Sequence, residues 1–435
     1  MAIRRHSRLA LVTLLVLLTL AACAGGSPGP TPTSAPAAST GRSVLLLWHA
    51  WPAPESRALA SIVERFNRTT PGVQVVLQSR PVARISADLA DAVIEGGGPH
   101  LALVPSHTLG ALVESGALLP ADDLLPAEQL ARLLPTAVGA GLVVTPEGTT
   151  LYGLPVAFDT LALYYNRANF TGDPPADTEA MLRVARAIAN PEGDPPVWGL
   201  AYNLSLDRTI GYMYAFGGTV FDDEGRVTLG VEGRAGAEAW LSWLVGLRED
   251  PRILASLDGV VVDNALNTQQ ALMTIDWAHA APAYSAIWPT TLGVAPLPRL
   301  TAGDAPPRPY VQSEALVLNA RLGGGAERAA AAAFARYIVG EGAQRELLRV
   351  GRQPVLMSLD LNADDPAVPP ALREAAIAFR AQAEAGQPMP NSREANEVVW
   401  GVLADMHSSA LRRLLPPAQA VEAADAALRA RLEGP

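Results

Sequence analysis

The sequence contains no lysine, so all 33 of its basic side chains are arginines. They are outnumbered by 43 acidic residues, which gives a formal net charge of −10. Because binding to a nucleic-acid backbone needs a basic surface, this balance argues against a nucleic-acid partner. We attribute the missing lysine to the composition of the genome rather than to function.

Cysteine and histidine are also scarce. The single cysteine, Cys23, excludes an internal disulfide and a cysteine-based metal site. The six histidines are scattered and lack the close spacing of a zinc site. We therefore expect neither a metal nor a cofactor.

Residues 1–22 have the pattern of a secretory signal. Three arginines precede an apolar run over residues 9–20, which is shorter than the about 20 residues of a membrane span. The segment ends in Leu-Ala-Ala-Cys and resembles the bacterial lipobox, in which the cysteine becomes the lipidated first residue. We predict lipidation at Cys23 and a flexible tether over residues 23–42, rich in Gly, Ser, Pro, Thr and Ala. The alternative is a chance cysteine after an ordinary signal peptide.

The rest of the chain is long enough for two domains and begins with a strand, a helix and a strand, at residues 44–48, 54–68 and 73–77. This order predicts a βαβ unit, and ligands of such sheets bind beyond the carboxyl ends of the strands. We therefore place Trp48, Trp51 and Glu55 at the mouth of a cleft. Exposing two tryptophans in one loop is costly, so we expect their rings to form a surface on which a ligand stacks.

Apolar periodicity predicts further elements along the chain. A strand is expected at residues 198–201 and another at 311–318, and helices are expected at residues 176–190, 205–216, 232–247, 264–271 and 326–349. The last three predicted helices cover residues 371–385, 393–415 and 418–432.

The stretch 151–170 places one carboxylate, Asp159, in the middle of an apolar run. A turn signal at residues 152–155 leads into segments with the pattern of buried strands. Asp159 is either a solvated residue at a strand end or an acid that faces a cleft where the chain crosses between two lobes.

This stretch resembles the first interlobe crossing of the family 1 extracellular solute-binding proteins, the sugar-binding components of ABC importers. The matching residues are Gly153, Pro155, Asp159, Leu163, Tyr165 and Asn166. Four other segments match the family in the right order, around Trp48, Trp198, Trp277 and Trp400, so that the resemblance covers about residues 43–432. The chain departs from the family's pattern at Gln269 and Asp276 before Trp277. It also has His107 where maltodextrin-binding relatives have Asp.

The resemblance implies an α/β protein with the two-lobe, type II periplasmic-binding-protein fold and a hinge between the lobes. We expect one lobe to hold residues 43–156 and 311–356, and the other to hold residues 157–310 and 357–435. The expected ligand-binding residues are Trp48, Trp51, Glu55, His107, Asp159, Trp277, Ser313 and Arg352. Of these, Trp277 is the strongest candidate for stacking on a sugar ring, whereas His107 either donates to a hydroxyl or caps a helix.

The implied function is that of a lipid-anchored monomer outside the cytoplasm, which captures a sugar or similar polyol and delivers it to an ABC permease. Glycerophosphodiesters and sugar phosphates are alternative ligands, for which Arg84, Arg208 and Arg352 are the candidate phosphate-binding side chains. A second class is a glycoside hydrolase with Glu55 and Asp159 as its carboxylate pair. A third is a binding protein that feeds a sensory receptor kinase. The resemblance favours binding without catalysis.

Overall fold

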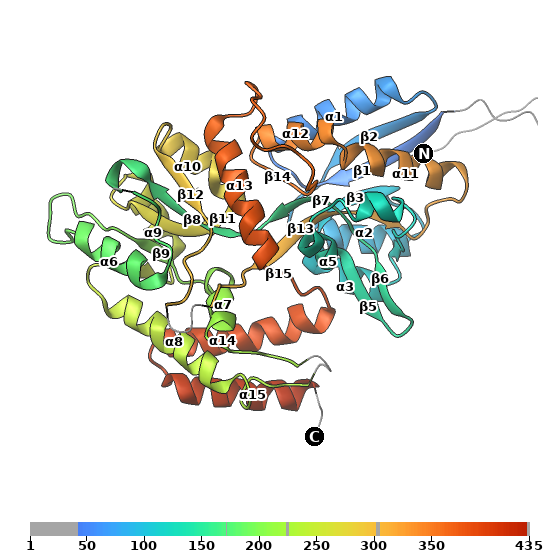
Figure 1. The fold of residues 1–435 in the computed structure, drawn as a ribbon. Coiled ribbons are helices and arrows are strands. Elements are labelled where there is room, and N and C mark those ends of the chain that lie inside the picture. The colour runs from blue at the N-terminus through green and yellow to red at the C-terminus, as the bar shows by residue number, and fades with distance from the viewer. Residues whose placement is uncertain (1–41, 171, 223–225, 302–304, 433–435) are drawn as a thin grey trace, which may run out of the picture. The chain divides into compact units, whose positions relative to one another are not determined.

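The computed structural model describes residues 42–170, 172–222, 226–301 and 305–432. The predicted signal peptide at residues 1–22, the lipidation site Cys23 and all of the tether except Arg42 lie outside the described residues. The described residues all belong to one compact unit, Arg42–Pro435 (Figure 1). No helix in the described part is both long and apolar enough to cross a membrane.

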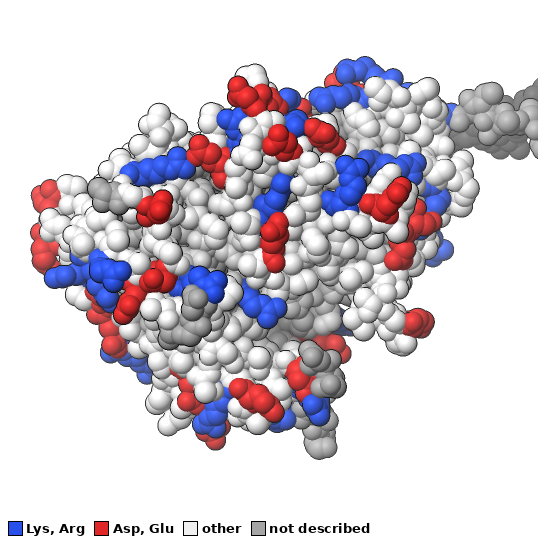
Figure 2. Space-filling model, in the orientation of Figure 1, with Lys and Arg blue, Asp and Glu red and all other residues white. Residues whose placement is uncertain are grey.

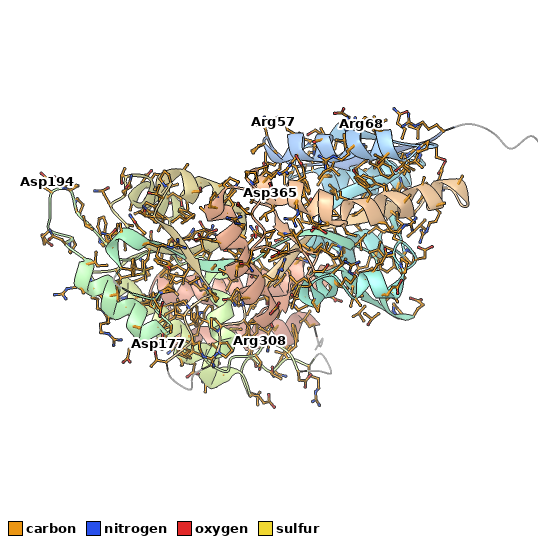
Figure 3. The ribbon with its side chains drawn as sticks, turned by 45° about the horizontal axis from the view of Figure 1, so that its top comes forward. Arg57, Arg68, Asp177, Asp194, Arg308 and Asp365 are labelled. Atoms are coloured by element: carbon orange, nitrogen blue, oxygen red, sulfur yellow. The ribbon has the colours of Figure 1, made fainter. Side chains whose placement is uncertain are left out.

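The larger sheet begins with the predicted βαβ unit. Strand β1 (Ser43–His49) pairs in parallel with β2 (Val73–Ser79) on one side and with β3 (Leu101–Pro105) on the other. Helix α1 (Glu55–Thr69) joins the first two strands and buries Leu59, Ile62, Val63 and Phe66 on one face, as their spacing predicts. Arg57 and Arg68 of this helix lie on the outer side (Figure 3).

The middle of this sheet is completed by a strand from much later in the chain. Strand β13 (Tyr310–Asn319) lies antiparallel between β3 and β7 (Leu154–Asp159), and β14 (Gln353–Pro354) pairs with the other edge of β7. The strand order is therefore β14-β7-β13-β3-β1-β2. The short strands β4 (Leu118–Leu119) and β15 (Gln387–Pro388) also pair with β13. The N-terminal strands β1, β2, β3 and β7 thus share one sheet with the later strand β13.

A second sheet follows directly after the first along the chain. Strand β8 (Leu161–Asn166) lies antiparallel between β11 (Met273–Trp277) and β12 (Leu292–Ala295). Only Thr160 separates β7 from β8, so the chain passes from one sheet to the other at this residue. The Thr160 hydroxyl donates to the carbonyl oxygen of Tyr310 at 3.1 Å, which ties the crossing to the start of β13. Beside this sheet, β9 (Ala201–Asn203) and β10 (Leu254–Ser256) form a parallel pair.

Helices pack around both sheets (Figure 1). Those belonging to the first sheet are α2 (Ile85–Ile94), α3 (Leu109–Glu114), α4 (Ala127–Leu130), α5 (Pro135–Gly141), α11 (Ala326–Ile338) and α12 (Glu341–Arg349). Those belonging to the second are α6 (Thr178–Ile188), α7 (Leu206–Ala215), α8 (Arg234–Glu249), α9 (Gly259–Asn267), α10 (Ala281–Ile287), α14 (Trp400–Leu411) and α15 (Pro417–Leu432). Helix α13 (Pro370–Ala385) contacts both β8 and β14, and a hairpin is formed by β5 (Leu142–Thr145) and β6 (Gly148–Leu151).

Several predicted boundaries are wrong. The helix expected at residues 264–271 is α9, which ends at Asn267, and Gln269 then has a positive φ of 57°, which a continuing helix does not allow. The helix expected at residues 326–349 is split into α11 and α12 at Gly340. The strand expected at residues 198–201 begins only at Ala201. The helix expected at residues 393–415 starts as a π-helical turn, η5 (Ala395–Val399), before α14.

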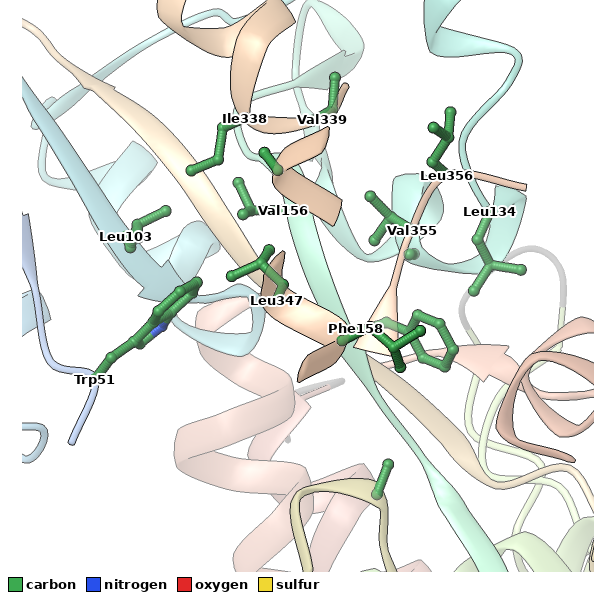
Figure 4. Close-up of a cluster of buried hydrophobic side chains, with 14 of the residues drawn as sticks. Trp51, Leu103, Leu134, Val156, Phe158, Ile338, Val339, Leu347, Val355 and Leu356 are labelled. Carbon is green, nitrogen blue, oxygen red and sulfur yellow. The ribbon is translucent and has the colours of Figure 1, made fainter. Parts of the chain in front are cut away.

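The core beneath the crossing is apolar, and Figure 4 shows Val156 and Phe158 of β7 among the side chains that fill it. The outer surface differs from this core in its charge. Figure 2 shows acidic and basic side chains interspersed over the face in view.

Candidate functional site

A small polar cavity lies where β7 ends. Its lining includes Asp159, His279, Ser313, Glu314, Arg352 and Gln353, and its volume is about 60 Å³. Three of the eight residues predicted to bind ligand, Asp159, Ser313 and Arg352, therefore meet here although they lie far apart in the sequence. They meet because β13 and β14 are the two neighbours of β7, so that Phe158 lies in register with both Ser313 and Gln353.

The mouth of this cavity is formed by Asp159 and His279. His279 belongs to the 3-10 turn η3 (Ala278–Ala280), which follows β11. Its Nδ1 lies 2.6 Å from Oδ2 of Asp159, and its backbone N–H donates to Oδ1 at 3.3 Å. The hydrogen bond to Asp159 raises the pKa of His279, which favours its charged form. The two side chains are 27% and 60% exposed, so the pair is accessible to a ligand.

The floor of the cavity is formed by two fully enclosed polar side chains. Ser313 and Gln353 are each 1% exposed. The backbone N–H of Ser313 donates to Oγ of Ser106 at 3.0 Å, and Nε2 of Gln353 donates to the carbonyl oxygen of Gly351 at 2.8 Å. The Oγ of Ser313 and the Oε1 of Gln353 have no hydrogen-bond partner among the described residues. Buried polar atoms are nearly always paired, so these two oxygens need an explanation.

Arg352 and Glu314 form the side wall. Nη1 of Arg352 lies 3.8 Å from Oε2 of Glu314, and its guanidinium carbon lies 4.5 Å above the ring of Trp51. Burial raises the pKa of Glu314, and the charge of Arg352 and the Trp51 side chain partly oppose that rise. The Nε of Arg352 has no partner among the described residues. The side wall thus carries one acidic and one basic side chain, whose opposite charges nearly cancel.

Trp48 and Trp51 are packed instead of lying open at a cleft mouth. Their residues are 4% and 3% exposed. The Nε1 of Trp48 donates to Gln78 at 2.8 Å, and the guanidinium of Arg80 lies 3.8 Å over its ring. Trp51 lies in the same buried cluster as Leu103 and Phe158 (Figure 4). The two rings are buried, and arginines from other segments lie over them. A role of either residue in binding stays a prediction.

Trp277 belongs to a polar network next to the crossing. Its indole N–H donates to Oδ2 of Asp207 at 2.8 Å, and its carbonyl oxygen accepts from the Tyr164 hydroxyl at 2.8 Å. The residue is only 8% exposed, so little of it is accessible. Its predicted stacking on a sugar remains untested.

Asp276 is the centre of this network. It accepts from Nη2 of Arg208 at 2.7 Å, from the Tyr284 hydroxyl at 2.9 Å and from the backbone N–H of Trp277 at 2.8 Å. Arg208 also contacts Asp207 at 3.1 Å. Burial together with Asp276 raises the pKa of Tyr284 far above its ordinary value. The network therefore fixes the end of β11, which carries Trp277, and the η3 turn that follows, which carries His279.

The two remaining predicted residues, Glu55 and His107, do not line the cavity at Asp159. Glu55 is the first residue of α1, and its Oε2 has no partner within the described part of the chain. His107 lies in η1 (Ser106–Thr108) and lines a different, mostly apolar pocket of about 300 Å³, together with residues of α2, α3 and η5. Its carbonyl oxygen accepts from Asn396 at 2.7 Å, and burial lowers its pKa.

Sequence reasoning did not find His279, Glu314, Gln353, Asp207 or Asp276 as members of a site. Glu314 directly follows Ser313 and Gln353 directly follows Arg352, so the predicted neighbours were a usable signal. His279 carries no such signal, because it reaches Asp159 only through the antiparallel pairing of β11 with β8, in which Trp277 lies opposite Leu161.

Comparisons with known proteins identify the family and the fold. A family model described as bacterial extracellular solute-binding protein matches residues 61–371. A stretch of 187 residues is 26% identical to the maltotriose-binding protein of Pyrococcus abyssi and covers 43% of this chain, but only 39% of the length of that relative.

Solved structures match over most of the chain. The maltotriose-binding protein of Thermus thermophilus, bound with maltotriose, is 26% identical with a TM-score of 0.70, covering 89% of this chain and 100% of that one. The maltose/maltodextrin-binding domain from Bdellovibrio bacteriovorus bound to maltotriose is 22% identical with a TM-score of 0.70, covering 90% of this chain and 100% of that one, and it shows the fold alone. The chain has the two-lobe fold of the periplasmic sugar-binding proteins, and it belongs to the family of bacterial extracellular solute-binding proteins.

Proposed function

We propose that this chain is the ligand-capturing component of an ABC importer and that its ligand is a maltooligosaccharide or a closely similar neutral sugar. The observation that carries the proposal is the polar cavity at the crossing, where Asp159 lies beside His279 and above Ser313. The proteins that this chain resembles bind maltotriose, as their names state.

The chemistry of the site suits a sugar. Sugar hydroxyls both donate and accept hydrogen bonds, and Asp159 offers a charged acceptor whose bonds are about twice as strong as neutral ones. Trp277 lies two residues before His279, and its aromatic ring is the proposed stacking surface for a sugar ring. Binding by these groups requires no covalent step, so we propose that the chain acts without catalysis.

The three arginines that a phosphorylated ligand would need are each occupied by an acid. Arg84 contacts Asp88 at 3.0 Å, Arg208 contacts Asp276 at 2.7 Å, and Arg352 lies 3.8 Å from Glu314. A phosphate group at any of them would approach a carboxylate of like charge, which costs free energy. These pairs favour a neutral sugar over a sugar phosphate or a glycerophosphodiester.

The remaining parts of the proposal concern the position of the protein in the cell. Hinged closure of two lobes around a ligand creates a state that a membrane partner can distinguish from the open one. We propose that the closed protein delivers the sugar to the permease subunits of the importer. We also propose that it stays at the outer face of the membrane through lipidation of Cys23.

The test is calorimetric titration with maltose, maltotriose and longer maltooligosaccharides, next to glycerophosphodiesters and glucose phosphates. We expect the maltooligosaccharides to bind and to raise the melting temperature, because a ligand that binds only the native state stabilises it. Asp159→Ala should weaken binding about ten-fold or more, since a hydrogen bond to a charged group contributes ~1.5–3 kcal/mol.

The matched control for Asp159→Ala is Asp177→Ala. Asp177 caps α6 by accepting from the backbone N–H of Ala180 at 2.7 Å, away from the cavity. Its loss should lower the stability by about 1 kcal/mol and leave the affinity unchanged. Unchanged affinity in Asp159→Ala, or preferential binding of the phosphorylated compounds, would contradict the proposal.

A further inference from the structure

We propose that His279 is a positioning residue that couples the affinity for the ligand to pH, because it holds the carboxylate of Asp159 in place most firmly when its imidazole is charged. The inference rests on the proposed function and deepens it, since it adds a form of regulation to the proposed ligand contact Asp159. His279 acts in this role through Asp159 and need not touch the ligand.

The contact between His279 and Asp159 continues a ladder of hydrogen bonds between the two sheets. One step beyond the last paired residues of β8 and β11, the backbone N–H of Ala278 donates to the carbonyl oxygen of Thr160 at 2.9 Å. The next residue, His279, reaches Asp159 with its backbone N–H at 3.3 Å and with its Nδ1 at 2.6 Å. Asp159 ends a strand of the larger sheet, so a turn of the second sheet holds its carboxylate.

The two bonds hold both oxygens of the carboxylate, and one of them depends on pH. The backbone N–H donates to Oδ1 at any pH, whereas Nδ1 contacts Oδ2 with a strength that follows the charge of the imidazole. A hydrogen bond between charged groups is about twice as strong as a neutral one. Deprotonation of His279 therefore leaves Asp159 bonded but less firmly oriented. A less ordered side chain loses more conformational entropy when a ligand binds to it.

The charged groups that face His279 favour its protonated form. Asp159 faces it from β7 and Asp276 from β11, whereas Arg208 of α7 opposes them. The hydrogen bond to Asp159 raises the pKa of His279, and burial and the charge of Arg208 only partly counter this rise. Arg208 is itself paired with Asp276 and Asp207, so much of its charge is compensated.

The other ionisable groups nearby come from α10, β13 and the residue before β14. Tyr284 of α10 donates to Asp276 and has a pKa far above its ordinary value, so it stays neutral. Glu314 of β13 and Arg352 lie 3.8 Å apart, so their charges nearly cancel. Burial also raises the pKa of Glu314, and variants at His279 are therefore needed to separate the two titrations.

A ligand that covers the pair strengthens the coupling. The side chains of Asp159 and His279 are 27% and 60% exposed, so a sugar bound at Asp159 takes water away from both. Covering a lone carboxylate costs more free energy than covering a carboxylate that is paired with a cation. Binding therefore favours the charged imidazole and takes up a proton, and by the same coupling protonation favours binding.

The test is the affinity for maltotriose, measured by calorimetric titration between pH 5 and pH 9. We expect the natural protein to bind about two- to ten-fold more weakly at pH 9 than at pH 5, since a charged hydrogen bond is replaced by a neutral one. Because binding takes up protons, the measured enthalpy near the pKa of His279 should differ between phosphate and Tris buffers, whose enthalpies of ionisation differ.

His279→Asn and His279→Ala separate this role from a merely structural one. The asparagine amide provides a neutral donor in the place of Nδ1. Its affinity should match that of the natural protein at pH 9, and it should lose most of the dependence on pH and the proton uptake. The alanine variant lacks the donor, so it should bind more weakly than the asparagine variant at every pH.

The matched control is His100→Asn, which replaces a histidine of the larger sheet. Nδ1 of His100 accepts from the backbone N–H of Leu46 at 3.0 Å, and His100 is not among the residues that line the cavity at Asp159. This variant should keep the pH dependence and the proton uptake of the natural protein.

An affinity of the natural protein that stays constant from pH 5 to pH 9, or that rises with pH, would overturn the inference. So would a His279→Asn variant that keeps the pH dependence of the natural protein, because another group, such as Glu314, would then be responsible. If the natural protein binds no maltooligosaccharide at any pH, the proposed function fails, and the inference falls with it.

Discussion

Asp276 holds the loop after β11 in place, and its removal should destabilise the protein strongly. The carboxylate accepts from Arg208, from Tyr284 and from the backbone of Trp277. The side chains of Asp276 and Arg208 are only 13% and 20% exposed. Asp276→Ala therefore leaves a largely buried guanidinium and a buried hydroxyl without their main acceptor.

The expected loss follows from these contacts. Breaking a buried ion pair by removing one partner costs about 3–5 kcal/mol, but Arg208 keeps Asp207 as a second acid at 3.1 Å. This lowers the ion-pair contribution to about 3 kcal/mol, and the unpaired Tyr284 hydroxyl adds about 1 kcal/mol. We therefore expect Asp276→Ala to lose about 4 kcal/mol of the free energy of unfolding.

Urea unfolding of the single variants Asp276→Ala and Arg208→Met and of the double variant measures the coupling directly. The double variant should be more stable than the sum of the two single losses predicts, by about 2 kcal/mol, because neither charge is then left alone. Asp405→Ala, at an exposed position of α14, is the control and should stay within about 0.5 kcal/mol of the natural protein. Purely additive losses, or a stable Asp276→Ala protein, would refute this account of the network.

Three further predictions concern titration and anchoring. Burial lowers the pKa of His407 from 6.5 to about 4, so the free energy of unfolding falls as the pH falls through this interval. Between pH 7 and pH 4 the natural protein should lose about 3 kcal/mol of this free energy through His407, and urea unfolding should show that His407→Gln does not lose it. The pKa of His279 is raised, so its pair with Asp159 stabilises the native state fully below pH 6.5 and loses this effect as the pH rises through the raised value. Asp159→Asn should then differ most from the natural protein in melting temperature near pH 5, and a constant difference from pH 5 to pH 9 would contradict this. Cys23→Ala should move the protein from the membrane fraction to the soluble fraction, and the lipobox interpretation is wrong if it does not.

The βαβ unit and the crossing were predictable because their signals are local. Apolar runs, one-sided helices and the turn before β7 depend on residues within a few positions of each other. The end of α9 was not predictable in this way. The periodic pattern continues past Asn267, but the chain turns at Gln269 so that β11 can pair with β8.

The site was predictable only where family resemblance or sequence adjacency named the residues. Asp159 could be placed at the crossing from the sequence, and the structure puts it at the mouth of a cavity. The sequence could not predict His279 as the partner of Asp159, because strand pairing brings the two residues together from segments more than a hundred residues apart. Burial of Trp48 and Trp51 was missed for a similar reason, since the arginines over their rings come from other segments.

The place of β13 in the larger sheet has a consequence for how the chain folds. The strands on either side of it, β3 and β7, are complete by residue 159, but their shared neighbour begins only at residue 310. One edge of β3 and one edge of β7 therefore stay unpaired until the chain extends past residue 310. Such distant pairing must overcome a large loss of chain entropy before its contacts form, which makes folding slow. A nascent chain released before residue 310 has the full βαβ unit but exposes two open strand edges, the surfaces on which aggregation begins.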